Sequence, residues 1–245
     1  MNDLIKARVD TRDWLKDSLT LEDFLWSAQP HVVEPLVSWL KDWIDWKHGE
    51  TDKPAPFLHL FGPFTLGKTQ LSYAITRYLI FNIYSPAAEY IYWPEYVKDQ
   101  LNGQKLEINW QARIMILDDF DGRRVIPKSM STWMLEDMLS IIKPRGIRGL
   151  PTIIITNREL IELEGFFARP SEGKANEDTE FFSNQVMEAI SRYTYASLGF
   201  RPLDGSGLND VRYHTLLREQ ARQTNDLQAL GFYYPREKYN IEVSF

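Results

Sequence analysis

The sequence predicts an α/β fold, a parallel sheet sandwiched by helices. Three observations indicate it. Short apolar runs alternate along the chain with stretches of helical periodicity. A glycine-bounded loop joins the first such run to a helix, and a later run ends in two adjacent carboxylates. With 245 residues, 44% of them hydrophobic and 25% charged, the chain has the composition of an ordinary folded protein with one main core.

The composition excludes several classes of protein. No uncharged apolar run approaches the roughly 18 residues of a membrane helix, and the first residues lack the apolar stretch of a secretory signal. The chain has no cysteine, which rules out disulfides and thiolate metal sites and fits a cytoplasmic location. A net charge of -6 argues against a broad basic surface, so any contact with DNA must be local.

The first part of the chain contains a strand between helices. Residues 20–50 are predicted to form two short helices separated at Pro30, because apolar residues recur at helical spacing. The KPAP break is followed by a buried parallel strand from Phe57 to Phe61. Residues 68–84 then form a core-facing helix with one apolar stripe, made of Leu71, Ile75, Leu79 and Ile83.

The rest of the chain continues this alternation. Three further strands are expected at 90–93, 113–120 and 150–157, and a strand-like segment at 194–200. Helices are expected at 94–101, where proline opens the helix, and at 129–143, 158–167 and 183–193. Residues 169–180 are polar and acidic without periodicity, which predicts a flexible loop. One more helical stretch, 210–223, lies in the tail.

The loop after the first predicted strand, GPFTLGKT, meets the phosphate-loop pattern G-x-x-x-x-G-K-[ST] in full. Its glycines let backbone N–H groups approach phosphates, Lys68 supplies a positive charge, and the Thr69 hydroxyl completes the shell of a Mg²⁺ ion. A strand before and a helix after the loop favour this interpretation over an ordinary strand-to-helix turn. The predicted ATP-binding residues are Gly62, Pro63, Phe64, Thr65, Leu66, Gly67, Lys68, Thr69 and Gln70.

Two carboxylates, Asp118 and Asp119, follow the third predicted strand, at the edge where parallel sheets bind their ligands. Asp118 is expected to hold Mg²⁺, directly or through water, and Asp119 to orient or deprotonate the attacking water. Two such residues after a strand are also common as a helix cap or a turn. Their position about 50 residues after a phosphate loop favours the catalytic interpretation.

Five segments, in this order and spacing, resemble successive motifs of the AAA+ ATPases of the DnaC and IstB type: GPFTLGKTQLSYAI, YIYWPEYVKDQL, RIMILDDFDG, RGIRGLPTIIITN and SNQVMEAISRY. Those proteins are bacterial helicase loaders and transposition accessory ATPases, relatives of the DnaA initiator. The resemblance implies a P-loop NTPase fold of the AAA+ type for residues 21–200. An N-terminal arm at 1–20 and a C-terminal extension at 201–245 would flank it.

The resemblance also assigns roles to two residues. Asn157 matches the sensor asparagine that contacts the γ-phosphate and the attacking water, although an asparagine that caps the next helix is the alternative. Arg192 matches the arginine that such ATPases insert into the neighbouring subunit's nucleotide, so turnover would depend on ATP-dependent assembly. Without the resemblance, an arginine at a helix end is usually a surface residue near the negative end of the dipole.

The sequence departs from the family pattern in several places. Thr65 stands where another glycine is usual, and Asp119 replaces the glutamate of most AAA+ proteins, which implies slow hydrolysis. No arginine clearly matches the second sensor, for which Arg201 and Arg212 are candidates. Only about 20 residues precede the family's core, so the partner contact is expected elsewhere, for example in the tail after Arg201.

Basic residues outnumber acidic ones between Arg123 and Arg148, and this segment is the candidate DNA-contacting edge. Its basic residues are Arg123, Arg124, Lys128, Lys143, Arg145 and Arg148. A solvated face and a subunit interface are the alternatives. The aromatic residues Tyr90, Tyr92 and Trp93 are candidates to stack on bases, although aromatic residues in a strand more often belong to the core.

These motifs predict an ATP-binding and ATP-hydrolysing accessory protein of DNA replication or transposition. It would assemble with ATP and Mg²⁺ on single- or double-stranded DNA, as a homo-oligomer, and recruit a replicative helicase or a transposase. A P-loop kinase for a small metabolite is one alternative, disfavoured because no arginine-rich lid is evident. A nucleotide-bound scaffold without significant hydrolysis is the other, because of Asp119.

Overall fold

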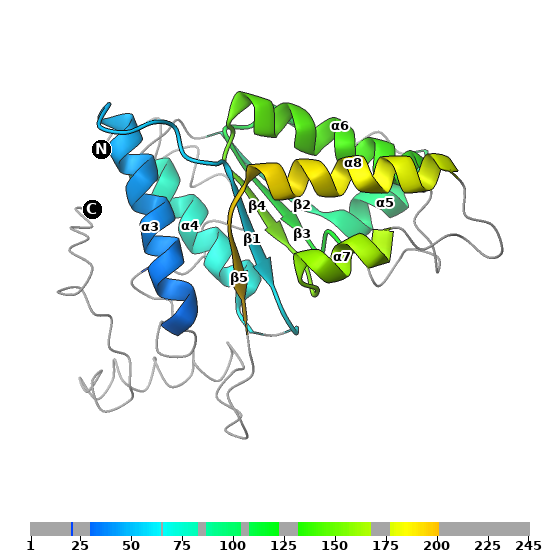
Figure 1. The fold of residues 1–245 in the computed structure, drawn as a ribbon, viewed down its shortest axis with the longest axis horizontal. Coiled ribbons are helices and arrows are strands. Elements are labelled where there is room, and N and C mark those ends of the chain that lie inside the picture. The colour runs from blue at the N-terminus through cyan, green and yellow to red at the C-terminus, as the bar shows by residue number, and fades with distance from the viewer. Residues whose placement is uncertain are drawn as a thin grey trace, which may run out of the picture. The chain divides into compact units, whose positions relative to one another are not determined.

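The structure, a computed structural model, describes residues 21, 30–64, 66–82, 87–103, 108–122, 132–167 and 177–200. These residues form two compact units. The first unit contains the helices α3 and α4, and the second contains the sheet and the remaining helices (Figure 1). Within the described ranges, no helix is both long enough and apolar enough to cross a membrane.

The elements follow the predicted alternation of strands and helices. The helices are α3 (Pro30–Lys47), α4 (Lys68–Asn82), α5 (Trp93–Leu101), α6 (Thr132–Arg148), α7 (Leu160–Phe167) and α8 (Glu177–Tyr193). The strands are β1 (Phe57–Phe61), β2 (Ala88–Tyr92), β3 (Ile114–Asp118), β4 (Thr152–Ile155) and β5 (Thr194–Gly199). Proline opens α5, as the sequence predicted, because its missing N–H has no partner to lose in the first turn.

The five strands form one sheet in the order β2, β3, β4, β1, β5. The pairs of β1 with β4, β2 with β3, and β3 with β4 are parallel. Figure 1 shows β5 running beside β1 in the same direction. The carboxyl ends of the strands therefore meet at one edge, where ligands bind in sheets of this kind. The prediction of an α/β fold with a parallel sheet is confirmed.

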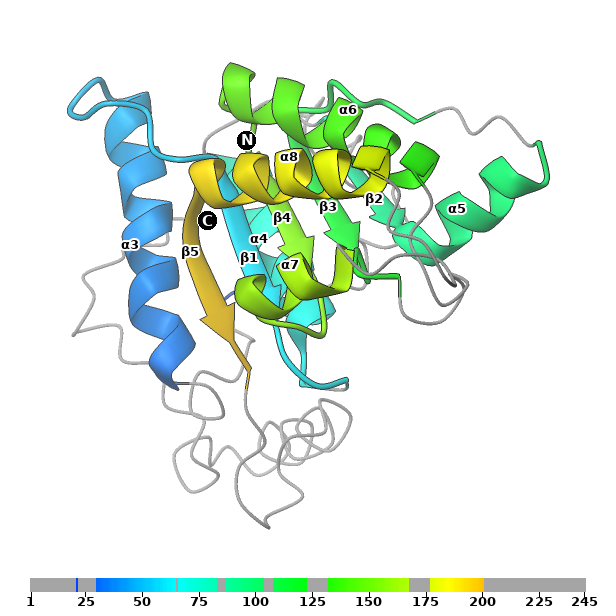
Figure 2. The same ribbon diagram turned by 45° about the vertical axis from the view of Figure 1, so that its right-hand side comes forward.

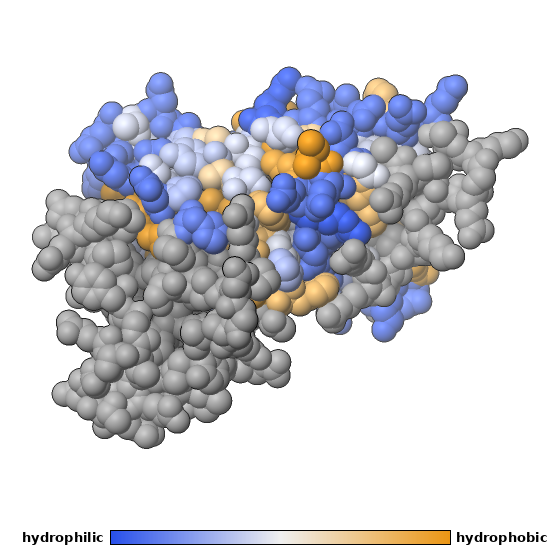
Figure 3. Space-filling model, turned by 60° about the horizontal axis from the view of Figure 1, so that its bottom comes forward, coloured by the Kyte–Doolittle hydropathy of each residue, from blue (hydrophilic) through white to orange (hydrophobic). Residues whose placement is uncertain are grey.

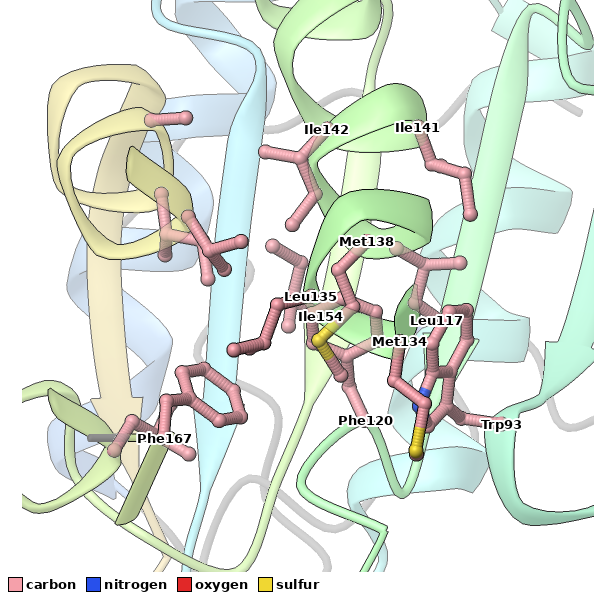
Figure 4. Close-up of a cluster of buried hydrophobic side chains, with 14 of the residues drawn as sticks. Trp93, Leu117, Phe120, Met134, Leu135, Met138, Ile141, Ile142, Ile154 and Phe167 are labelled. Carbon is pink, nitrogen blue, oxygen red and sulfur yellow. The ribbon is translucent and has the colours of Figure 1, made fainter. Parts of the chain in front are cut away.

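The core of the second unit lies between the sheet and α5, α6, α7 and α8, which cover one of its faces (Figure 2). Trp93, Leu117, Met138 and Ile154 are among the buried side chains that converge there (Figure 4). The burial of Trp93, which is fully enclosed, excludes it from the predicted stacking on bases. Burial of such large apolar side chains is the main stabilising contribution to a fold of this size.

Helix α6 extends beyond its predicted end. The sequence placed its last residue at Lys143. Pro144 cannot donate a backbone hydrogen bond, which disfavours helix at this point. The helix nevertheless continues through Pro144 to Arg148 and ends at Gly149, whose φ is 60°. The Arg145 side chain is buried in this last turn and makes several hydrogen bonds, which offset the one that proline removes.

Helix α8 begins earlier than predicted. Residues 177–180 were expected in a loop, yet they form its first turn, and the remainder of that predicted loop lies outside the described residues. Glu177, Asp178 and Glu180 are all in this turn. Negative side chains stabilise the positive end of a helix dipole, so their acidity favours helix here. This first turn contains no apolar residue, so the spacing of apolar residues did not predict that it is helical.

The first unit contains two amphipathic helices. In α3, the predicted apolar stripe of Val33, Leu36, Leu40 and Ile44 is buried except for Ile44, which is half-buried. Trp39 and Trp43 are buried with it, their rings edge to face 6.0 Å apart. The preceding predicted helix lies outside the described residues except for its start. In α4, Leu71, Ile75 and Leu79 have no exposed surface, which confirms the predicted stripe as far as Leu79.

Exposed hydrophobic side chains are scattered over the described surface. They include Leu101, Ile147, Ile161 and Phe181, which come from α5, α6, α7 and α8 respectively. On the face drawn in Figure 3, hydrophobic residues gather in small groups separated by hydrophilic ones. Such single exposed apolar residues are normal on folded proteins and need no functional explanation.

Candidate functional site

The carboxyl edge of the sheet brings together polar residues from two neighbouring strands. Asp118 is the last residue of β3, and Asp119 follows it; Thr156 and Asn157 directly follow β4. Because β3 and β4 are parallel, with Leu117 opposite Ile154, these ends lie side by side. The side-chain amide Nδ2 of Asn157 donates to Oδ1 of Asp119 at 2.9 Å. Residues that the sequence singled out separately thus meet in space.

Asp119 has an unusual backbone conformation. Its φ is 52°, in the left-handed region that non-glycine residues rarely adopt and aspartate tolerates better than most. Two hydrogen bonds fix this turn: the Asp119 N–H donates to Oδ1 of Asp118 at 2.8 Å, and the Gly122 N–H donates to the Asp119 carbonyl at 2.7 Å. Strained residues of this kind concentrate at functional sites, where the surroundings hold them in place.

Two tyrosines of β2 contact the two carboxylates. The Tyr90 hydroxyl donates to Oδ2 of Asp118 at 3.0 Å, and the Tyr92 hydroxyl donates to Oδ2 of Asp119 at 3.4 Å. The two residues are two positions apart in the strand, so both side chains point to the same face of the sheet. Base stacking and the core were the predicted alternatives for these tyrosines, and neither anticipated hydroxyl contacts with Asp118 and Asp119.

Asp121 is a third carboxylate at this edge, and it was not among the predicted site residues. It has no exposed surface, and its Oδ2 accepts a hydrogen bond from Nη1 of Arg158 at 2.6 Å. Asn157 makes longer contacts to it, from the backbone N–H and from Nδ2, both at 3.4 Å. Burial raises the pKa of Asp121, while the Arg158 charge opposes that rise. The guanidinium of Arg158 also lies 3.9 Å from the ring centroid of Phe166.

The phosphate-loop pattern has the backbone features that it requires. Gly62 and Gly67 have φ values of 130° and 88°, at which a residue with a Cβ would be strained. Lys68 is the first residue of α4, and its Nζ donates to the Pro63 carbonyl at 2.7 Å. The Leu71 N–H donates to the Gly67 carbonyl, so the helix starts directly at the second glycine. Thr65 lies outside the described residues.

The available donors suit Mg²⁺ and a nucleotide. Mg²⁺ prefers oxygen ligands, and in nucleotide sites it is held by one or two protein oxygens together with phosphates and water. Asp118 in the second unit offers a carboxylate of this kind, and Thr69 in the first unit offers a hydroxyl. Among the described residues, no three His, Cys, Asp or Glu side chains form a metal-binding group. Glycine backbone and a lysine ammonium at a helix N-terminus suit the phosphates.

Of the predicted DNA-contacting residues that the structure describes, two are exposed and one is buried. Lys143 and Arg148 are exposed on α6. Arg145 is only 1% exposed, and its guanidinium donates to Oγ1 of Thr152 and to the carbonyls of Trp110, Ala112 and Pro151. A DNA phosphate cannot reach a buried guanidinium that already donates four hydrogen bonds inside the protein, so Arg145 must be removed from the set. Arg123, Arg124 and Lys128 lie outside the described residues.

Arg192 lies in the last turn of α8 with 64% of its side chain exposed. Its Nη2 pairs with Oε1 of Glu188, one turn earlier, at 2.8 Å. Glu188 is also largely exposed. Exposed pairs of this spacing contribute about 0.3–0.5 kcal/mol, so the guanidinium can leave this partner at little cost.

No sequence-family model matches this chain, and no curated protein sequence matches it. Several solved structures do. A structure of DnaI is 18% identical, has a TM-score of 0.51, and is matched over 80% of this chain and 93% of that one. A protein from Streptococcus pyogenes, proposed to be a primosome component, is 16% identical with a TM-score of 0.54, over 84% and 99% of the two chains.

AMPPCP-bound DnaA from Aquifex aeolicus is 15% identical with a TM-score of 0.51, over 93% of this chain and 60% of that one. At such low identity these likenesses concern the fold alone. They confirm the predicted α/β fold class and show that the chain shares its fold with the structures of DnaI and DnaA.

Proposed function

We propose that this chain is an ATP-binding and ATP-hydrolysing accessory protein of DNA replication or transposition that works with Mg²⁺ in the cytoplasm. The observation that carries the proposal is the hydrogen bond from the Asn157 amide to the Asp119 carboxylate, beside Asp118. An amide and two carboxylates at the carboxyl edge of a parallel sheet, in a chain with a complete phosphate-loop pattern, suit hydrolysis of a nucleoside triphosphate.

The residues have distinct proposed roles. Gly62 to Gln70 bind the phosphates, with Lys68 supplying the charge. Asp118 and Thr69 would hold Mg²⁺, which when bound neutralises negative charge on the phosphates. Asp119 orients the attacking water or accepts its proton, and Asn157 fixes the rotamer of Asp119 by donating to Oδ1. Its remaining amide atoms can then contact water or phosphate.

We propose that Arg192 acts on the nucleotide of a neighbouring subunit, so that hydrolysis requires an ATP-dependent homo-oligomer. Its exposure and its weak partner Glu188 support this role, because a residue used in trans must be free to leave its own chain. A guanidinium inserted in this way stabilises the charge that develops during phosphoryl transfer.

The proposed partners are DNA and a replicative helicase or a transposase, as the family resemblance implies. Lys143 and Arg148, both exposed on α6, are the described residues that we propose contact DNA phosphates. Replacement of both by alanine is expected to weaken DNA binding and to lower the slope of log affinity against log salt by about two, since each phosphate contact contributes about one. An unchanged slope would remove α6 from the DNA contact.

The hydrolytic activity is tested by measuring free phosphate released from ATP with Mg²⁺. Lys68→Ala is expected to weaken ATP binding roughly tenfold to hundredfold, as for the loss of a charge-assisted hydrogen bond. Asp119→Asn is expected to keep ATP binding and lose turnover. Lys41→Ala, an exposed residue of α3, is the matched control and should change neither. Transfer of phosphate to an added metabolite, instead of its release, would show a kinase.

Assembly is tested by light scattering without nucleotide, with ATP and Mg²⁺, and with DNA added. The mass is expected to grow only with ATP. Arg192→Ala should lose turnover but bind ATP normally, whereas Glu188→Ala removes only the ion-pair partner and should leave turnover intact. A monomeric mass in every condition, or equal turnover in the two variants, would contradict the role of Arg192.

A further inference from the structure

His59 lies in β1 with no exposed surface, and both nitrogens of its ring contact hydroxyl groups. Nδ1 is 2.6 Å from Oγ of Ser197 in β5, and Nε2 is 2.8 Å from Oγ1 of Thr156, directly after β4. Strand β1 lies between β4 and β5 in the sheet. The imidazole therefore joins the two strands on either side of its own.

The hydrogen bonds in this chain of contacts all run in the same direction. The Thr156 hydroxyl donates its single proton to the Arg158 carbonyl at 2.7 Å, so its oxygen must accept from His59. Nε2 of His59 then carries the ring proton, and Nδ1 accepts from the Ser197 hydroxyl. Ser197 therefore donates to His59, His59 donates to Thr156, and Thr156 donates to the Arg158 carbonyl, so each proton is used in one hydrogen bond.

The His59 ring is held neutral and fixed in place. Burial lowers the pKa of His59 to about 3, so the ring carries one proton at neutral pH, as the direction of the hydrogen bonds requires. The ring of Phe61, two residues further along the strand, stacks on it with centroids 5.4 Å apart. A stacked ring with both nitrogens bonded cannot turn without breaking two hydrogen bonds.

The end of the chain of contacts encloses Asn157. Thr156 precedes it and bonds across it to the carbonyl of Arg158, while the Arg158 guanidinium holds Asp121. The backbone at Asn157 is thus fixed from both sides, and its side chain reaches Asp119 from this position. The chain of contacts starts at Ser197 in β5. This strand directly follows α8, whose last turn contains Arg192.

We propose that Ser197, His59 and Thr156 form a hydrogen-bonded relay that positions the Asn157 amide against Asp119. The relay also couples β5, the strand that follows Arg192, to the carboxyl edge of the sheet. His59 and Thr156 are positioning residues, since they act through Asn157 and touch no substrate. The role of the relay in turnover rests on the proposed ATPase function. Its effect on Asn157 does not, and the two are measured separately.

The positioning is tested by nuclear magnetic resonance on the full chain. In the wild type, the nitrogen shifts of His59 should report a neutral ring protonated at Nε2. The side-chain amide resonances of Asn157 should move in Thr156→Val and in Ser197→Ala, and stay near their wild-type positions in Thr156→Ser, which keeps the hydroxyl. Ser197 is exposed, so its variant should fold normally, and Ser191→Ala in α8 is the matched exposed control.

The effect on catalysis is tested by steady-state kinetics. Thr156→Val and Ser197→Ala should each lower kcat roughly two- to tenfold, the change expected for one neutral hydrogen bond, with the KM for ATP unchanged. Thr156→Ser should restore kcat. A merely structural role would not separate kcat from KM or be rescued by serine.

The outcomes distinguish the two proposals. If the Asn157 resonances move as expected but no variant hydrolyses ATP, the wild type included, the relay stands and the proposed function fails. The relay is overturned if the Asn157 resonances ignore both Thr156→Val and Ser197→Ala, if Thr156→Ser shifts them as much as valine does, or if His59 is protonated at Nδ1.

Discussion

Asn157 donates from Nδ2 to Oδ1 of Asp119 at 2.9 Å, and this bond joins the ends of two neighbouring strands. Asp119 adopts a left-handed backbone at the same place, and Oδ2 of the same carboxylate accepts from Tyr92. Each oxygen of Asp119 therefore has a donor, and the rotamer of the carboxylate is set by residues on both adjacent strands. A carboxylate held in this way is oriented before any substrate arrives, which is what a water-positioning group requires.

The first prediction concerns the donor. Asn157→Asp places a third charged carboxylate between Asp119 and Asp121 and removes the amide protons. Turnover should fall by at least about tenfold, because groups that position or activate water contribute at least that much, while ATP binding should change little. Phosphate release and nucleotide binding measured on the same preparation check this. Asn102→Asp, exposed after α5, is the control, and equal turnover in both variants would contradict the assignment.

The second prediction concerns the buried pair of Asp121 and Arg158. Arg158→Met leaves the Asp121 carboxylate buried without its cation, which should destabilise the fold by about 3 kcal/mol, in the range for breaking a buried ion pair. Adding Asp121→Asn should recover part of the loss, because the buried charge disappears. A double-mutant cycle of denaturant midpoints measures the coupling. Strictly additive effects would show that the pair contributes nothing specific.

The sequence predicted the parts of the site that repeat a local pattern. The glycines and Lys68 are fixed by the turn between β1 and α4, and Asp118, Asp119 and Asn157 follow directly from the ends of apolar strands. Asp121 and His59 were missed, and the hydroxyl contacts of Tyr90 and Tyr92 were not anticipated. These contacts depend on the strand order and on register across the sheet, which no local pattern encodes. Arg145 was misassigned for the same reason: a charged residue in a basic stretch gives no sign that its helix turn is buried.

The third prediction is a pH dependence of stability. The folded pKa of His59, about 3, lies below the usual value of 6.5, so the unfolded chain binds a proton between these values and the folded chain does not. Stability contributed by neutral His59 is complete above about pH 6.5 and is lost as the pH falls toward 3. Between about pH 7 and pH 5.5 the wild type should lose about 1 kcal/mol more than His59→Gln. Equal losses in urea unfolding would mean that His59 titrates normally.

The fourth prediction follows from the interior of α6. The buried Arg145 guanidinium bonds one hydroxyl and three carbonyls but no carboxylate in the described structure, and burial lowers its pKa to about 9. Arg145→Met should destabilise the protein by about 3 kcal/mol, since several buried acceptors lose their donors. Arg145→Lys should be only partly better, because an ammonium cannot span these acceptors. Arg148→Ala, exposed in the same helix turn, should cost less than about 0.5 kcal/mol.

The last prediction compares two helical glycines. A Cβ on Gly146 in α6 would come within 2.1 Å of Cδ2 of Tyr193, the final residue of α8, whereas a Cβ on Gly165 in α7 would meet nothing within 4 Å. Alanine ordinarily stabilises an exposed helical position by up to about 1 kcal/mol relative to glycine. Gly165→Ala should therefore raise the denaturant midpoint. Gly146→Ala should lower it, because the Tyr193 ring packs edge to face on Phe57 at 5.7 Å and must move.

The same pair of variants separates packing from assembly. Tyr193 follows Arg192, so a displaced ring in Gly146→Ala should also shift the end of α8 and reduce ATP-dependent turnover, while Gly165→Ala leaves turnover unchanged. If Gly146→Ala proves as stable as the wild type, the Tyr193 ring moves without penalty. Helices α6 and α8 then pack less tightly at Gly146 and Tyr193 than the structure indicates. If it is destabilised but turns over ATP normally, the position of Arg192 does not depend on this contact.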